Sequence, residues 1–213
     1  MVSRIDSMTK SVFDLHTDKY DDWFNTHQHA FLTELLVLKK ELTNAKKAIE
    51  IGVGTARFAQ LLNISFGIDI SYPMVKIAKR RGCEVAIADA KDLPLRTGDF
   101  DFVLLMVTLC FIKYPKRVIK EAKRILTTHG KLIVGIIDKT SELARSYQKK
   151  NSIFYNSARF FSTREVIQLL RNNGFYNIRT TQTLFNDPYK MKKIDVFKSG
   201  YGEGGFVVIT GTK

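Results

Sequence analysis

Short apolar runs alternate with amphipathic segments along the middle of the chain. The apolar runs, each typical of a buried strand, lie at 48–51, 65–71, 84–88, 100–107 and 130–137. Amphipathic segments with the apolar spacing of a helix stand between them at 57–62, 72–81 and 116–127. Strands that alternate with helices predict a mostly parallel sheet, because parallel neighbours need a long crossover connection.

The N-terminal part has a pattern of its own. Residues 1–19 are polar and mixed, which predicts a loosely held arm. From Tyr20 to Leu42 an apolar stripe predicts one long amphipathic helix or two shorter ones. We therefore expect an arm and covering helix over 1–44 and a main domain over 45–213, together forming a single compact domain.

The C-terminal part begins with a polar and aromatic stretch over 139–161. Ser162 or Thr163 can cap a following helix, which Gly174 ends. Residues 177–185 and 205–210 then have the composition of a sixth strand and a last strand.

Composition places the chain among globular proteins. It has 213 residues, of which 45% are hydrophobic and 26% are charged. A net charge of +13 would suit nucleic acid or an acidic substrate, but the basic residues are spread along the chain, which favours a generally basic surface.

Cysteine usage and hydropathy narrow the class further. Cys83 and Cys110 are the only cysteines and form no C-x-x-C pair, so neither a disulfide framework nor a metal site is indicated. The first ten residues lack the apolar core of a signal peptide, and the longest apolar run, 102–112, is too short to span a bilayer. We expect a soluble cytoplasmic protein without a membrane segment.

A turn with two glycines follows the first apolar run. Gly52 and Gly54 have no Cβ, so a ligand can approach the backbone there, and Thr55 can cap the next helix. A strand, a bare turn and a helix N-terminus together form a nucleotide-type site. The dinucleotide pattern G-x-G-x-x-G/A would place Arg57 where a small residue is needed, which disfavours a nicotinamide-dependent oxidoreductase.

Four stretches together resemble one family, the class I S-adenosylmethionine-dependent methyltransferases of the ubiquinone- and menaquinone-biosynthesis type. Glu50-x-Gly52-x-Gly54 is similar to its first motif, with Ala56 in place of a third glycine. Gly67-Ile68-Asp69-Ile70-Ser71-x-x-Met74 is similar to its second motif. Asp89-Ala90-x-x-Leu93-Pro94 and Phe100-Asp101-x-Val103 resemble the stretches that follow, so the resemblance covers about residues 46–138.

The resemblance implies an α/β, Rossmann-like fold: a seven-stranded, mostly parallel sheet with helices on both faces and a terminal antiparallel strand. It also implies S-adenosylmethionine as cofactor. Glu50 and the glycine turn would hold the methionine part, with Glu50 near its ammonium group. Met106 would border the same part of the cofactor.

The nucleoside would lie against the tips of the next two strands. Asp69 ends a predicted strand, where its two oxygens can accept hydrogen bonds from both ribose hydroxyls. The resemblance places Ile70 and Met74 beside the adenine and ribose. It also implies that Asp89 accepts from the adenine amino group while the backbone of Ala90 donates to the ring.

The residues that would bind the methyl acceptor are predicted less directly than those that would bind the cofactor. Tyr20 and Trp23 either pack on the domain or cover the cofactor and line an acceptor pocket. Ligands bind at the carboxyl ends of parallel strands, where the segment after strand five and the loop 186–204 emerge. We therefore expect Tyr155, Arg159, Tyr201 and Glu203 to help form the acceptor site, although the glycines at 200–205 also suit a simple hairpin.

The predicted reaction is methyl transfer to a small molecule. The family often has two histidines where this chain has Cys110 and Phe111, so a histidine base is absent. This favours N- or C-methylation, with an amine as one acceptor, because a neutral amine needs no strong base. The alternatives are an RNA or other nucleic-acid methyltransferase, suggested by the charge, and a non-catalytic S-adenosylmethionine-binding protein.

Overall fold

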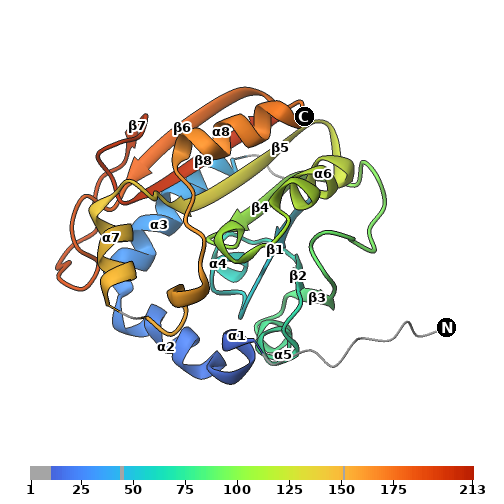
Figure 1. The fold of residues 1–213 in the computed structure, drawn as a ribbon. Helices are drawn as coiled ribbons and strands as arrows, with labels where there is room; N and C mark the ends of the chain where they lie inside the picture. The colour runs from blue at the N-terminus through green and yellow to red at the C-terminus, as the bar shows by residue number, and fades with distance from the viewer. Residues whose placement is uncertain (1–10, 44–45, 151) are drawn as a thin grey trace.

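An eight-stranded sheet forms the centre of the molecule (Figure 1). The computed structural model describes residues 11–43, 46–150 and 152–213. Its strands, in chain order, are β1 (Ala48–Ile51), β2 (Phe66–Asp69), β3 (Glu84–Ile87), β4 (Phe100–Met106), β5 (Leu126–Ile137), β6 (Tyr176–Thr183), β7 (Lys198–Ser199) and β8 (Phe206–Thr212).

The sheet has the order β3-β2-β1-β4-β5-β8-β6-β7. The first five strands of this order are parallel, and β8 runs antiparallel to both β5 and β6. The predicted fold class is therefore confirmed, including the terminal antiparallel strand. The eighth strand is β7, a two-residue edge strand within the loop that precedes β8.

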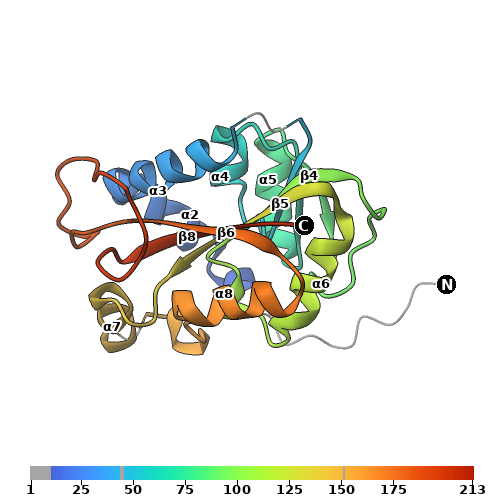
Figure 2. The same cartoon turned by 90° about the horizontal axis from the view of Figure 1, so that it is seen from above.

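Helices cover both faces of the sheet, as Figure 2 shows, with α3, α4 and α5 on one face and α6, α7 and α8 on the other. The helices are α1 (Val12–Leu15), α2 (Thr17–Thr26), α3 (Gln28–Glu41), α4 (Arg57–Leu61), α5 (Tyr72–Arg80), α6 (Pro115–Ile125), α7 (Glu142–Lys149) and α8 (Thr163–Asn172), with short 3-10 turns η1 (Leu109–Phe111) and η2 (Tyr155–Ser157). None of the helices in the described ranges has the length and hydropathy of a transmembrane span.

Capping residues set several helix starts. The Ser71 hydroxyl accepts from the Met74 N–H at the start of α5, and Ser162 forms a capping box with Glu165 at the start of α8, as predicted. The prediction for Thr55 was wrong. Ala56 is the N-cap of α4, with a φ of 63° and no side-chain cap, while the Thr55 hydroxyl donates to a carboxylate of α2.

The N-terminal segment is more ordered than the sequence suggested. Residues 1–10 lie outside the described part, but Ser11 and Asp14 form a capping box that begins α1. The predicted loose arm is therefore wrong for 11–19, which is largely helical. The predicted amphipathic helix is two helices, α2 and α3, which meet at His27.

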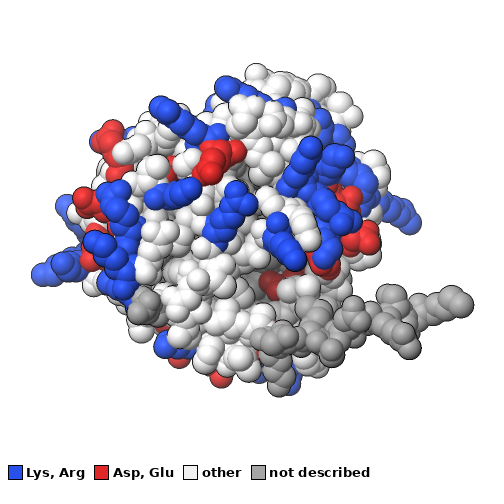
Figure 3. Space-filling model, in the orientation of Figure 1, with Lys and Arg blue, Asp and Glu red and all other residues white. Residues whose placement is uncertain are grey.

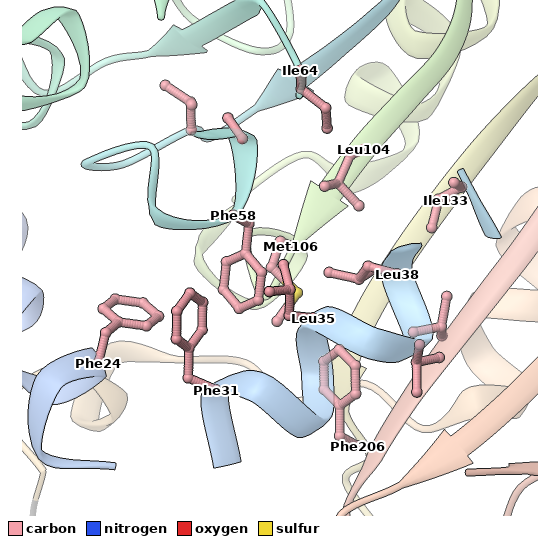
Figure 4. Close-up of a cluster of buried hydrophobic side chains, with 14 of the residues drawn as sticks. Phe24, Phe31, Leu35, Leu38, Phe58, Ile64, Leu104, Met106, Ile133 and Phe206 are labelled. Atoms are coloured by element: carbon pink, nitrogen blue, oxygen red, sulfur yellow. The ribbon is translucent and has the colours of Figure 1, made fainter. Parts of the chain in front are cut away.

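A cluster of buried rings holds α2 and α3 against the sheet (Figure 4). The ring of Phe31 lies 5.1 Å from that of Phe24 and 5.0 Å from that of Phe58, measured between centroids. Leu38 of α3 packs in the same cluster. Each such side chain contributes about 1.5–3 kcal/mol by leaving water, so the N-terminal helices are part of the core.

Candidate functional site

A cavity of about 900 Å³ lies between the glycine turn and the N-terminal helices. Carboxyl ends of parallel strands border one side, and α1 and α2 border the other (Figure 1). The cavity brings together most residues that the sequence singled out. Those that line it are Tyr20, Trp23, Glu50, Gly52, Gly54, Asp69, Ile70, Met74, Asp89, Ala90, Met106 and Tyr155.

The two glycines of the turn adopt conformations that other residues rarely reach. Gly52 has a φ of +75°, and a Cβ on it would lie 2.3 Å from Cγ2 of Thr108. Gly54 has a φ of +53°, and a Cβ there would lie 3.2 Å from the Tyr20 hydroxyl oxygen. The turn is therefore closely surrounded, and its backbone is open to the cavity only because both residues are glycines.

Glu50 carries a buried carboxyl group at the floor of the cavity. Its residue is 2% exposed, and Oε2 has no hydrogen-bond partner among the described residues. Burial raises the pKa of Glu50 well above its ordinary value, and the charge of Asp69 raises it further, against a lowering effect of the Ala59 backbone. A buried carboxyl oxygen without a partner is costly, so Oε2 of Glu50 is suited to a ligand that brings a positive charge.

Asp69 is held by the backbone around it. The N–H of Gly54 donates to Oδ2 at 2.8 Å, and the N–H of Ser71 donates to Oδ1 at 2.9 Å. Burial nevertheless raises the pKa of Asp69, although these hydrogen bonds act in the opposite direction. Each oxygen keeps a second lone pair, so the carboxylate can still accept two hydroxyl groups of a ligand.

Asp89 lies at the next strand end and is compensated by a lysine. The Lys91 ammonium donates to Oδ2 at 2.6 Å, and the Lys91 N–H donates to Oδ1 at 3.0 Å. Burial alone would raise the pKa of Asp89, but these contacts lower it below its usual value. Asp89 is therefore an ionised acceptor beside the backbone of Ala90.

Aromatic residues from four parts of the chain line the opposite side of the cavity. We call this set the aromatic chamber: Phe13, Tyr20, Trp23, Phe24, Phe111, Tyr147, Phe154, Tyr155 and Tyr189. Tyr147 and Tyr155 stack with centroids 4.7 Å apart, and Phe13 meets Phe111 edge to face at 4.8 Å. Tyr20 belongs to both halves of the site, because it also lies against Gly54.

Glu34 was missed by the sequence analysis. It lies on α3, is 6% exposed and lines the cavity. Its carboxyl makes no hydrogen bond or ion pair to any residue in the described ranges, and burial raises its pKa from 4.5 to about 8. The available signal was an acid placed three residues after Phe31 and four before Leu38, within the apolar stripe of the helix.

An ion-pair cluster joins α2 to the start of α4 and the end of α5. Asp21 accepts hydrogen bonds from Arg57 Nε at 2.9 Å, from Arg81 Nη1 at 2.7 Å and from the Thr55 hydroxyl at 2.6 Å. These contacts lower the pKa of Asp21, although burial alone would raise it. The sequence analysis had treated Arg57 only as a misfit to the dinucleotide pattern.

Three predicted acceptor residues do not line the cavity. The Arg159 N–H donates to the Cys110 carbonyl at 2.8 Å, and its guanidinium lies 5.0 Å from the Phe161 ring centroid. Tyr201 is 40% exposed, and Glu203 pairs with Lys198 at 2.9 Å. The tip of the 186–204 loop folds back on β6, and the loop reaches the cavity through Tyr189 instead.

Known proteins resemble this chain in sequence and in fold. A family model described as a methyltransferase domain matches residues 49–134. An uncharacterized protein of Methanocaldococcus jannaschii is 46% identical over 205 residues, which cover 95% of this chain and 99% of the relative. Over 92 residues the chain is also 32% identical to a mouse protein described as a probable tRNA methyltransferase 9B, covering 41% of this chain and 21% of that protein.

A solved structure from Thermotoga maritima is similar over nearly the whole chain. It is described as an S-adenosylmethionine-dependent methyltransferase and possible histamine N-methyltransferase. The TM-score is 0.92 at 46% sequence identity, and the match covers 95% of this chain and 98% of that one.

Proposed function

The chain belongs to the class I S-adenosylmethionine-dependent methyltransferases, and on that premise we propose that it methylates a small molecule, most favourably at an amine nitrogen. One observation carries the proposal: the aromatic chamber and the glycine turn share a single cavity of about 900 Å³. Apolar and aromatic walls with few polar groups are typical of small-molecule sites. The similar Thermotoga maritima structure, described as a possible histamine N-methyltransferase, supports the same class of acceptor.

The residues around the glycine turn fit the cofactor. The unpartnered Glu50 Oε2 is a buried acceptor that suits the ammonium group of S-adenosylmethionine, and the bare backbone at Gly52 and Gly54 leaves room beside it. Asp69 would accept the ribose hydroxyls with its remaining lone pairs. Asp89 and the Ala90 backbone would meet the adenine edge, with Ile70, Met74 and Met106 as apolar neighbours.

When bound, S-adenosylmethionine supplies a methyl group that is already activated by a sulfonium. The protein's task is therefore to orient the acceptor and exclude water. We assign the exclusion of water to α1 and α2, whose rings cover the cavity and whose Asp21 is tied to Arg57 and Arg81.

The tyrosine hydroxyl groups of the chamber are poor bases at neutral pH. Burial raises the pKa of Tyr147 and Tyr155 above their ordinary values. These groups stay protonated and cannot activate a hydroxyl acceptor. An amine, whose nitrogen becomes a nucleophile after losing one proton, is the better match.

A direct test is methyl transfer by the purified protein from radiolabelled S-adenosylmethionine. The acceptors are arylalkylamines including histamine, matched phenols and alcohols, and an unmodified tRNA transcript. We expect label in the amines only. Label in the phenols or alcohols alone would contradict the amine assignment, and label in the tRNA alone would contradict the small-molecule assignment.

A second candidate function is methylation of RNA, which the similarity to a probable tRNA methyltransferase 9B suggests over 41% of the chain. Basic side chains gather over α6 in Figure 3, and Lys116, Lys120, Lys123 and Lys213 line one hollow there. That helix follows Lys113 and Tyr114, which border the cavity. If RNA is the substrate, replacing the three lysines of α6 with glutamine will weaken transfer to RNA and reduce the salt dependence of the transfer that remains; activity on amines will be unaffected.

A further inference from the structure

We propose that the aromatic chamber binds its acceptor as an organic ammonium ion and that Glu34 is the carboxylate that receives this ion and then its proton. The inference rests on the proposed function, because it specifies the acceptor of that site. It assigns Glu34 a role in contact with substrate and limits the acceptor to amines carried on an apolar body.

Among the buried acids that line the cavity, Glu34 is the one whose charge no described residue or expected cofactor group compensates; Asp22, which also lines the cavity, is exposed to solvent. Asp69 accepts two backbone N–H groups, and Asp89 is paired with Lys91. Glu50 faces the glycine turn, where the cofactor ammonium would neutralise it. Glu34 lies on the chamber side of the same cavity, and its carboxyl has neither a hydrogen bond nor an ion pair within the described part of the chain.

The walls around Glu34 suit a cation as well. The faces of aromatic rings attract ammonium groups, most strongly where water is excluded. The chamber already holds one such contact, because the Lys150 ammonium lies 3.8 Å from the centroid of the Tyr189 ring. Rings together with one buried carboxylate provide both apolar contact and the single negative charge that an organic ammonium ion requires.

The neighbours of Glu34 support its central position. Tyr20 on α2, Tyr147 on α7 and Tyr155 on η2 come from separate elements. Each has a raised pKa for which burial is the main cause and the Glu34 charge a further one. The other titratable groups that line the cavity from α2, from the end of α7 and from the 186–204 loop are Lys19, Asp22, His27, Lys150 and Tyr189.

The burial of Glu34 leads to a prediction about the release of a proton when a ligand binds. With a pKa of about 8, Glu34 is mostly protonated at pH 6.5 when the chamber holds no cation. An ammonium ion favours the charged form of a neighbouring carboxyl, so its binding will displace the Glu34 proton into solution. A neutral acceptor of the same shape will displace none.

The chemical step balances with these groups alone. The ammonium nitrogen gives one proton to the Glu34 carboxylate and thereby gains a free electron pair. The nitrogen then forms a bond to the methyl carbon, whose bond to sulfur breaks with the electron pair remaining on sulfur. The product is an N-methylammonium ion beside a protonated Glu34, which is also the state of Glu34 in the empty chamber, so the one proton that the reaction releases is the one displaced when the amine binds.

The test is calorimetric titration of the full chain, saturated with S-adenosylhomocysteine, at pH 6.5 in two buffers of different ionisation enthalpy. The probes are 2-phenylethylamine and histamine as cations, 2-phenylethanol as the neutral analogue and 3-phenylpropionate as the anion. We expect at least one amine to bind, to bind in preference to the alcohol and the acid, and to release about one proton.

The variant Glu34→Gln keeps the size of the side chain and removes its charge. We expect it to bind that amine at least about tenfold more weakly, as the loss of a charge-assisted hydrogen bond predicts. Proton release will disappear, while affinity for S-adenosylhomocysteine stays the same. Glu41→Gln is the matched control, because Glu41 lies on the same helix outside the cavity and accepts from the hydroxyls of Thr181 and Thr210.

Several outcomes overturn the inference. They are no binding of either amine, equal binding of 2-phenylethylamine and 2-phenylethanol, and amine binding with proton release that persists in Glu34→Gln. The comparison of probes uses the natural protein, so it decides the question even if the variant does not fold. Amine binding that depends on Glu34 but is not followed by methyl transfer would contradict the proposed function and leave this inference standing. Amine methylation at the same rate in Glu34→Gln would contradict this inference and leave the proposed function standing.

Discussion

Arg81 donates two hydrogen bonds, each of 2.7 Å, to the two carboxylate oxygens of Asp21, 60 positions earlier in the chain. This pair joins α2, which covers the cavity, to the end of α5, which follows the second strand of the sheet. Arg57 shares the same carboxylate from α4. Helix α2 is therefore held over the cavity by the ion pairs of Asp21 as well as by the buried rings of Phe24, Phe31 and Phe58.

Replacing Asp21 with alanine will weaken the attachment of α2 to α4 and α5. The change leaves Arg57 and Arg81 without their anion in a partly buried site, and we expect the free energy of unfolding to fall by about 2–4 kcal/mol. Hydrogen exchange will be faster in α1 and α2 than in the central strands. Asp18→Asn, on the exposed side of α2, is the control and will change stability by less than about 1 kcal/mol. Equal exchange in α2 for all three proteins would contradict this role.

Replacing Glu50 with glutamine will weaken the binding of a ligand that carries the amino-acid part of the cofactor more than the binding of one that lacks it. We expect affinity for S-adenosylhomocysteine to fall about 10- to 100-fold, because a charge-assisted hydrogen bond to the ligand ammonium is lost. Affinity for 5′-methylthioadenosine, which lacks the amino-acid part, will change little. Calorimetric titration of both ligands measures the difference. A parallel loss for both ligands would place Glu50 elsewhere than at the ammonium.

The Glu34 carboxyl will lower stability as the pH rises. Its pKa is 4.5 when unfolded and about 8 when folded, so the folded state binds its proton more tightly. The wild type will therefore lose about 1.4 kcal/mol per pH unit between these values relative to Glu34→Gln. The two proteins will be similar at pH 4.5, and the variant will be more stable at pH 8.5.

Chemical denaturation of both proteins at several pH values checks this prediction. The difference between the two free energies of unfolding isolates Glu34, because all other groups titrate in both proteins. A constant difference across the range would show that Glu34 is not desolvated in solution.

Replacing Gly52 with alanine will create a steric conflict that a second substitution can relieve. The new Cβ would lie 2.3 Å from Cγ2 and 2.4 Å from Oγ1 of Thr108, which predicts a loss of about 1–3 kcal/mol from overpacking. The positive φ adds about 1–2 kcal/mol. Thr108→Ala in the same protein removes these two atoms but keeps Cβ, at 2.9 Å, so it will recover a large part of the steric loss and leave the backbone strain. A double-mutant cycle from chemical denaturation measures the recovery, and strictly additive effects would contradict it.

The side of the cavity around the glycine turn was accessible to sequence reasoning because its residues are close together along the chain. Glu50 lies in β1 just before the turn that holds Gly52 and Gly54, Asp69 ends β2, and Asp89 follows β3. Parallel strands bring their carboxyl ends to one edge, so local patterns are sufficient to place such residues together. The same locality explains why the caps at Ser71 and Ser162 were predicted correctly.

The aromatic chamber required the tertiary structure. Its nine rings come from helices, two 3-10 turns and two loops, and nothing local distinguishes Tyr189, which lines the cavity, from Tyr201, which does not. Packing decided which loop residue points inward, and the backbone of Glu203 is instead turned toward Gln182.

The sequence by itself determined the alternation of strands and helices over 48–137, the glycine turn and the acids at the strand ends, because each depends on short-range backbone preferences and on periodicity. It did not indicate α1, α7 or β7. Only the tertiary structure decided that Glu34 is buried without a partner, that Asp21 joins two arginines and that nine aromatic rings form one chamber. These features depend on which distant segments exclude water from one another, and burial of that kind is a property of the packed chain.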